Sequence, residues 1–259
     1  QLLDQSRSRE QAQRQEQVKR LNDSVDADAL QQQADAILCQ AAPDRESIEK
    51  AQKLYQRARR LRRSIPLIEE RLTHHDQRLA LIEGSESFLT DLMQADWDDA
   101  EDRSRQLREL KVELEDLLTP RRQRRRSSPP QGQPQPLEIR SRNGLVIQVG
   151  RNHRQNEWIS LRQARAGDLW FHAQECPGSH VVLKASAAVA SEQDLQLAAD
   201  LAAWFSRAKG NRRVPVVMSA VEHLQRIPGT APGTVRHREA ELLWAEPDRA
   251  RETLKQETP

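Results

Sequence analysis

The chain has 259 residues, of which 36% are hydrophobic and 31% charged, and its mean hydropathy is −0.85. This length allows one or two domains, but the low apolar content disfavours a single compact globule. The formal net charge of +2 permits nucleic-acid binding without requiring it.

Cys39 and Cys176 lie far apart in the sequence and indicate no disulfide framework, so we expect a reducing, cytoplasmic location. No run of about 18 apolar residues is present to form a transmembrane helix, and the polar start has no signal-peptide pattern. We therefore expect no membrane partner. The opening residue, Gln1, favours a fragment that starts within a helix.

The first 118 residues have the composition of helices and coiled coils. Residues 1 to about 39 lack Gly and Pro and predict one long helix, which Pro43 ends. A second helix is predicted over about 45–83. Its apolar residues are spaced by threes and fours for more than four heptads: Ala51, Leu54, Ala58, Leu61, Ile65, Ile68, Leu72, His75, Leu79 and Ile82. This pattern predicts an antiparallel coiled coil over 1–118, in which the arginines between the seam positions form a solvated face.

Gly84 and Ser85 predict the end of that helix, and a third helix is expected over about 86–118, with a break near Asp96. Residues 119–136 are rich in Pro, Gln and Arg and predict a disordered or extended linker. The linker contains five arginines. It is either a solvated connection or a tether whose arginines contact RNA phosphates.

From residue 137 the apolar period shifts towards two, which predicts a compact mixed domain over 137–248 and a flexible tail over 249–259. Strands are expected near 138–140, 145–149, 157–161, 168–173 and 180–184, and again at 214–221, 224–227, 235–238 and 241–244. One helix begins at Ser191 with Asp194 in a capping-box position and ends by Gly210. The overall fold class is therefore α+β.

The loop over 150–156 carries side chains suited to RNA. Arg151 and Arg154 can meet phosphates, while Asn152, Gln155 and Asn156 can donate to sugar or base edges. The same amides could instead bond the backbone of the loop and hold its shape. We weigh the two interpretations evenly.

A second polar turn lies between two β-like runs and carries His172, Gly178, Ser179 and His180. The backbone at Gly178 and the Ser179 hydroxyl can approach a phosphate, and either histidine can stack or donate a hydrogen bond. A metal site formed by these histidines and Cys176 is disfavoured, because the turn breaks the helix that would bring residues spaced by four together. A catalytic nucleophile at the turn is also disfavoured, because no partner acid is evident. We therefore expect no metal, no cofactor and no catalytic residue.

The two segments GRNxRQN, over 150–156, and DLWFHAQxxPGSHVVL, over 168–183, resemble the RNA-binding domain of the NFACT family. The resemblance extends over roughly 140–247. The preceding helices are similar to the long antiparallel coiled coil of that family, although only 40–45 stand where the family usually has a small middle domain.

The resemblance implies a non-enzymatic protein of ribosome-associated quality control that binds the large ribosomal subunit obstructed by peptidyl-tRNA. In that family some members recruit alanyl-tRNA and extend the stalled chain, using an N-terminal domain with no counterpart in these 259 residues. The alternative, drawn from another name of the family, is a structural or adhesion module of the fibronectin-binding type without RNA function.

Overall fold

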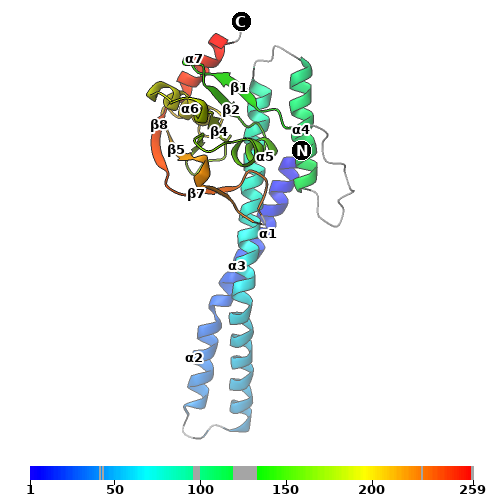
Figure 1. Cartoon of the computed structure of the whole chain (residues 1–259). Coiled ribbons are helices and arrows are strands. Elements are labelled where there is room, and N and C mark those ends of the chain that lie inside the picture. Colours follow the sequence, from blue (N-terminus) through cyan, green and yellow to red (C-terminus); the bar gives the residue numbers. More distant parts are fainter. Residues whose placement is uncertain (41, 43, 96–99, 119–132, 229, 258–259) are drawn as a thin grey trace. The chain divides into compact units, whose positions relative to one another are not determined.

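A computed structural model describes residues 1–40, 42, 44–95, 100–118, 133–228 and 230–257. The chain divides into two compact units, Gln1–Ile82 and Glu83–Pro259. The elements, labelled in Figure 1 where there is room, are α1 (Leu2–Val25), α2 (Ala27–Leu38), α3 (Arg45–Gln94), α4 (Ala100–Leu118), β1 (Leu137–Arg140), β2 (Val146–Val149), α5 (His153–Glu157), the π-helix η1 (Trp158–Arg162), β3 (Leu169–Ala173), β4 (Val181–Leu183), the 3-10 turn η2 (Ala185–Ala187), α6 (Glu192–Trp204), β5 (Val214–Ala220), the 3-10 turn η3 (Val221–His223), β6 (Leu224–Arg226), β7 (Val235–His237), β8 (Glu241–Ala245) and α7 (Pro247–Glu257).

In the first unit, helices α1 and α2 lie antiparallel to helix α3 and pack along it. Ion pairs define the direction, because Arg14 meets Asp76 at 2.6 Å near one end and Asp28 meets Arg62 at 2.6 Å nearer the other. The side chain of Tyr55 also donates to that of Asp35. The predicted antiparallel pairing of the first two helices is confirmed within this unit.

The predicted heptad seam is the buried face of α3. Ala51, Ala58, Ile68 and Ile82 are buried, and the remaining seam positions are half-buried. His75 completes the seam as a polar member, since its Nδ1 lies 2.8 Å from a carboxylate oxygen of Glu10. Small alanines on this face let the helix backbones approach closely.

Two helix boundaries differ from the prediction. The first helix is interrupted at Asp26, and α3 continues through Gly84 to Gln94. The continuation has a packing reason: Ser85, Phe88 and Leu92 are all buried and follow the helical spacing of three and four. This burial outweighs the cost of about 1 kcal/mol for glycine within a helix.

The second unit contains a six-stranded antiparallel sheet in the order β1-β2-β4-β3-β5-β8 and a two-stranded ribbon of β6 and β7. One face of the large sheet packs on α6, and α7 packs on α6, with Phe171, Leu183, Leu201 and Ala250 in the core. The predicted capping box is present, since Ser191 accepts from the Asp194 backbone and Asp194 accepts from that of Ser191. The other face carries a smaller core around Trp170 and Ile159.

The segment predicted as a strand over 157–161 is helical, formed by the end of α5 and by η1. A short apolar run does not distinguish a strand from a buried helix. Here the Asn152 side chain accepts from the Gln155 backbone and starts a helix, which buries Ile159 completely.

The predicted flexible tail over 249–259 is also different, because α7 reaches Glu257. Its Ala250 is fully buried against the core, and Arg249 pairs with Asp200 at 2.8 Å. The predicted linker and the predicted break near Asp96 fall mainly on 119–132 and 96–99, which lie outside the described residues. Among the described helices, none is long and apolar enough to cross a membrane.

Candidate nucleic-acid interface

The first polar motif forms a tight turn into α5. The Asn152 side chain accepts from the backbone N–H of Gln155 at 2.8 Å, and the Gln155 side chain accepts from the backbone N–H of Arg151 at 2.8 Å. Both amides are buried. For these two residues the structure shows the second of the two interpretations, in which the amides hold the shape of the loop.

Helix α4 packs on the start of α5 through polar contacts. The two carboxylate oxygens of Glu113 accept from the backbone N–H groups of His153 and Arg154, each at 2.9 Å. The Gln155 side chain donates to Gln106 at 3.0 Å. Burial raises the pKa of Glu113 to about 7, although those two hydrogen bonds act in the opposite direction. The N–H groups that could have faced a phosphate are therefore already satisfied within the domain.

Asn156 joins the two polar motifs. Its oxygen accepts from the backbone N–H of His180 at 3.0 Å, and its amide nitrogen lies 3.4 Å from the carbonyl of Gly178. Gly178 is itself confined, because a Cβ there would lie 2.8 Å from the Cβ of Ser206. Ser179 donates its backbone N–H to the Phe205 carbonyl and is 1% exposed.

The two histidines of the second motif belong to an aromatic cluster around Trp170. The ring of His172 stacks on Trp170 at 5.7 Å, and the ring of His180 meets it edge-on at 5.1 Å. Burial lowers the pKa of His172 to about 4 and that of His180 well below its usual range. Both imidazoles are therefore neutral at pH 7 and offer no charge to a phosphate.

The two arginines of the first motif are half-buried. The Arg151 guanidinium lies 6.0 Å from the centre of the Phe205 ring. Burial lowers the pKa of Arg151, although the negative charges of Asp102 and Asp91 act in the opposite direction. Six predicted RNA contacts are instead buried parts of the domain: Asn152, Gln155, Asn156, Gly178, Ser179 and His180. Arg151, Arg154 and His172 keep partial exposure, and their contact with RNA stays a prediction.

The second turn was also weighed as a metal site and as a nucleophile. The Nδ1 of His180 lies 2.8 Å from the hydroxyl of Ser160, so its nearest hydroxyl partner is not that of Ser179. Within the described ranges, no group of three or more His, Cys, Asp or Glu side chains is placed to hold a metal ion.

An exposed basic surface lies on the arm instead. We call it the arm arginine surface, and define it as the seven Lys and Arg residues between Lys50 and Arg63, a segment that contains no Asp or Glu. All seven are exposed: Lys50, Lys53, Arg57, Arg59, Arg60, Arg62 and Arg63.

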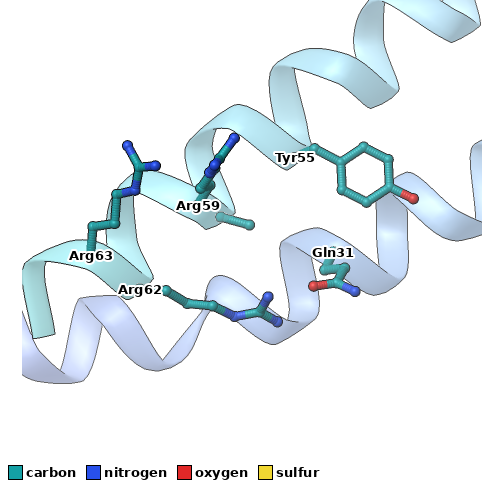
Figure 2. A pocket seen from close by; sticks show the side chains of 6 residues that line it. Gln31, Tyr55, Arg59, Arg62 and Arg63 are labelled. Atoms are coloured by element: carbon teal, nitrogen blue, oxygen red, sulfur yellow. The ribbon is translucent and has the colours of Figure 1, made fainter.

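The arm arginine surface borders a hollow of about 450 Å³ lined by Gln31, Tyr55, Ala58 and three of its arginines. Figure 2 shows Arg59 and Arg63 extending to the same side of α3, whereas Arg62 reaches towards α2, where it pairs with Asp28. The sequence prediction treated these arginines only as a solvated face. The signal that it overlooked is the lack of any acidic residue over 50–66.

In the second unit, several basic residues after α6 are engaged with carboxylates. Lys209 pairs with Asp91 at 2.8 Å, Arg207 with Glu83 at 3.5 Å, and Arg226 with Glu157 at 3.5 Å. Arg212, Arg236 and Arg238 are exposed and have no carboxylate partner among the described residues.

Residues 137–238 match the family described as the NFACT protein RNA binding domain. The chain is 30% identical over 208 residues to the Rqc2 homolog RqcH of Bacillus subtilis (strain 168), which covers 80% of the chain and 34% of that protein. It is 38% identical over 102 residues to the Rqc2 homolog RqcH of Streptococcus suis (strain 05ZYH33), a match that covers 39% of the chain and 18% of that protein. The chain thus spans about a third or less of the length of these relatives.

A solved structure has a similar fold over almost the whole chain. It is the C-terminal part of the fibronectin/fibrinogen-binding protein from Streptococcus suis, with a TM-score of 0.77 over 98% of this chain and 94% of that one. The sequence identity is 23%, so the likeness shows the fold alone. A coiled-coil arm followed by a mixed domain is therefore an arrangement that another protein shares.

Proposed function

We propose that this chain, whose residues 137–238 form an RNA-binding domain of the NFACT family, is an RNA-binding component of ribosome-associated quality control. The similarity to RqcH proteins supports the NFACT role. The finer proposal is that the chain binds the large ribosomal subunit obstructed by peptidyl-tRNA, in the cytoplasm and without catalysis.

The observation that carries this proposal is the arm arginine surface, which places seven exposed cations and no acid within 14 consecutive residues, 50–63. Arginine suits phosphate because its planar guanidinium binds two oxygens at once. Among the described residues, Arg59, Arg60 and Arg63 form no ion pair, so binding RNA breaks no internal contact of theirs. Neutralising several phosphates releases counterions and gives affinity that falls steeply with salt.

In the full-length family this binding is linked to tRNA recruitment and to tailing of stalled chains. We propose that this chain contacts rRNA or tRNA, including peptidyl-tRNA and alanyl-tRNA. Its contribution is attachment, through the basic arm and the NFACT RNA-binding domain.

The test is co-sedimentation with large ribosomal subunits, with and without bound peptidyl-tRNA, over a salt series. We expect stronger binding to the occupied subunit and a loss of binding as salt rises. The double variant Arg59→Glu with Arg63→Glu should weaken binding at least tenfold and flatten the salt dependence, since each phosphate contact contributes about one unit to the log–log slope.

The matched control is Arg9→Glu with Arg71→Glu, which makes the same change in net charge at exposed positions of the first unit outside the arm arginine surface. Equal losses in the two variants would reduce the effect to net charge and remove the support from this surface. Absence of binding to subunits and to tRNA at low salt, together with retention on fibronectin, would favour the adhesion alternative.

A further inference from the structure

The sheet face opposite α6 is covered over only part of its width. Strand alternation places Trp170 and Val182 on this face, where Ile159 and the β6–β7 ribbon cover them. At the β8 side the cover ends, and Leu242 is 50% exposed and Trp244 56% exposed. Among the described residues of the second unit, none covers this exposed tryptophan.

Neighbouring side chains on this face form a strip across three strands. Trp244 lies opposite Pro215, Leu242 lies opposite Val217, and Val217 lies opposite His172 on the next strand. We call these five residues the β5–β8 strip. Val217 is buried, Pro215 and His172 are half-buried, and the two side chains on β8 are exposed. At the inner end, the ring of His172 stacks on Trp170.

Two side chains of α6 occupy the C-terminal end of the backbone edge beside the strip. The carbonyl of Trp244 accepts from the side chain of Gln196 at 3.1 Å, and the backbone N–H of Glu246 donates to Asp200 at 2.7 Å. A peptide or a second copy that extended the sheet at this end of β8 would have to displace both α6 side chains. At this end, the side-chain face of the strip is therefore more accessible to a partner than the backbone edge.

Cations stand at both ends of the strip. Arg212 and Arg213 immediately precede β5, whose first residue pairs with the last residue of β8. Arg236 and Arg238 flank His237 of β7, whose ring lies 5.8 Å from that of Trp170.

The nearby carboxylates are engaged or lie on the other face of the sheet. Glu246 pairs with Arg213 at 3.4 Å, and Glu239 lies 3.6 Å from His223. Glu241 shares the strand parity of Leu243, which packs towards α6. The strip therefore presents an aromatic surface bordered by positive charge. A nucleotide matches both features, whereas an apolar peptide without acidic residues matches only the first.

We propose that the β5–β8 strip is a stacking platform for single-stranded RNA, with a base on Trp244 and its phosphate at the exposed Arg212, beside the Arg213–Glu246 ion pair. This inference rests on the proposed RNA-binding function and assigns a separate subsite within it. Aromatic stacking is tolerant of sequence because every base has a π face, so the platform selects unpaired RNA over duplex RNA. Leu242 and Pro215 provide the apolar floor for a neighbouring base.

The test uses an unstructured eight-nucleotide uridylate RNA and a duplex RNA hairpin of similar charge, titrated into the whole chain. Binding of the single strand should quench tryptophan fluorescence, and the quenching should be absent in Trp244→Ala. We expect Trp244→Ala to lose about tenfold in affinity for the single strand and little for the hairpin. Trp244→Phe should recover most of the affinity because it keeps a ring for stacking.

Val189→Ala is the matched control, since Val189 is 98% exposed in the second unit and outside the strip. Circular dichroism of each variant establishes that it is folded. Equal losses for the two RNAs, or unchanged affinity in Trp244→Ala, would overturn the platform while leaving the subunit binding intact. A concentration-dependent dimer that Trp244→Ala abolishes would instead assign the strip to self-association. Failure to bind any RNA or subunit would remove the proposed function itself.

Discussion

The arm and the mixed domain use polar residues in opposite ways. On the arm, the seven basic residues over 50–63 are exposed, and the buried seam is apolar except for Gln17, His75 and the Glu10 partner of His75. In the second unit, the residues that look most suited to a ligand are buried, with Gln155 fully withdrawn from solvent. There the most exposed aromatic side chain among the described residues is Trp244.

The difference teaches that a polar motif in a compact domain and a charge run on a helix need different interpretations. A two-helix coiled coil has one contact stripe, so every residue off that stripe meets water. A domain with a sheet and several helices has many internal surfaces, and buried amides there satisfy backbone groups that would otherwise be unpaired. Three variants or conditions test this contrast, from the largest expected effect to the smallest.

The largest effect is expected for Asn156→Ala. The change leaves the backbone N–H of His180 without its acceptor and removes a contact to the Gly178 carbonyl. Because each unsatisfied buried group costs about 1–3 kcal/mol, the free energy of unfolding should fall by about 3 kcal/mol. Urea denaturation followed by tryptophan fluorescence reports on the second unit, since all five tryptophans follow residue 83.

The control is Asn211→Ala, which removes an exposed asparagine in the same unit and should change stability by less than about 0.5 kcal/mol. If Asn156→Ala kept its stability and lost RNA affinity, the buried amide would be a binding residue, and the contrast between the two regions would fail.

A pH titration tests the burial of His172. Folding lowers its pKa from 6.5 to about 4, so the unfolded chain binds the proton more tightly and acid favours unfolding. The effect is absent above about pH 7 and grows as the pH falls below 6.5, reaching about 2.5 kcal/mol at pH 4.5. Glu113, with a pKa raised to about 7, acts in the opposite sense over much of this range.

The quantity to measure is therefore the difference between wild type and His172→Phe, in which the contribution of Glu113 cancels. The variant keeps an aromatic ring against Trp170 but has nothing to titrate at residue 172. Parallel pH curves for the two proteins would mean that His172 is solvated, and its ring would then be available to a ligand as the sequence suggested.

The smallest of the three effects is expected on the arm. Ala58 is 2% exposed on the seam of α3, so Ala58→Leu should overpack it and lower the free energy of unfolding by about 1–2 kcal/mol. Ala80→Leu makes the same change at an exposed position of the same helix and should have little effect, because alanine and leucine have similar helix propensities. Thermal unfolding followed by helical circular dichroism compares the two, and equal melting temperatures would show that the seam does not pack at Ala58.

Much of the fold follows from local pattern. The heptad seam between Ala51 and Ile82, the capping box at Ser191 and Asp194, and the strands of the large sheet were all predictable, since each depends on residues close together in the chain. The resemblance to the NFACT RNA-binding domain was also predictable, because its two motifs are contiguous in the sequence. The helix over 153–162 was not predicted, because Asn152 was considered as a ligand group or as a contact that shapes the loop, and not as a helix cap.

The tertiary structure alone decided which polar residues are inside the second unit. Glu113 meets the backbone of His153 from 40 residues away, and Asn156 meets that of His180 from 24 away, and neither pairing has a local signal. The exposure of Trp244 depends likewise on strand order, since β8 is last in the sheet and the cover of that face ends before it. Sequence periodicity determines which side of an element is apolar, but only long-range packing determines what covers that side.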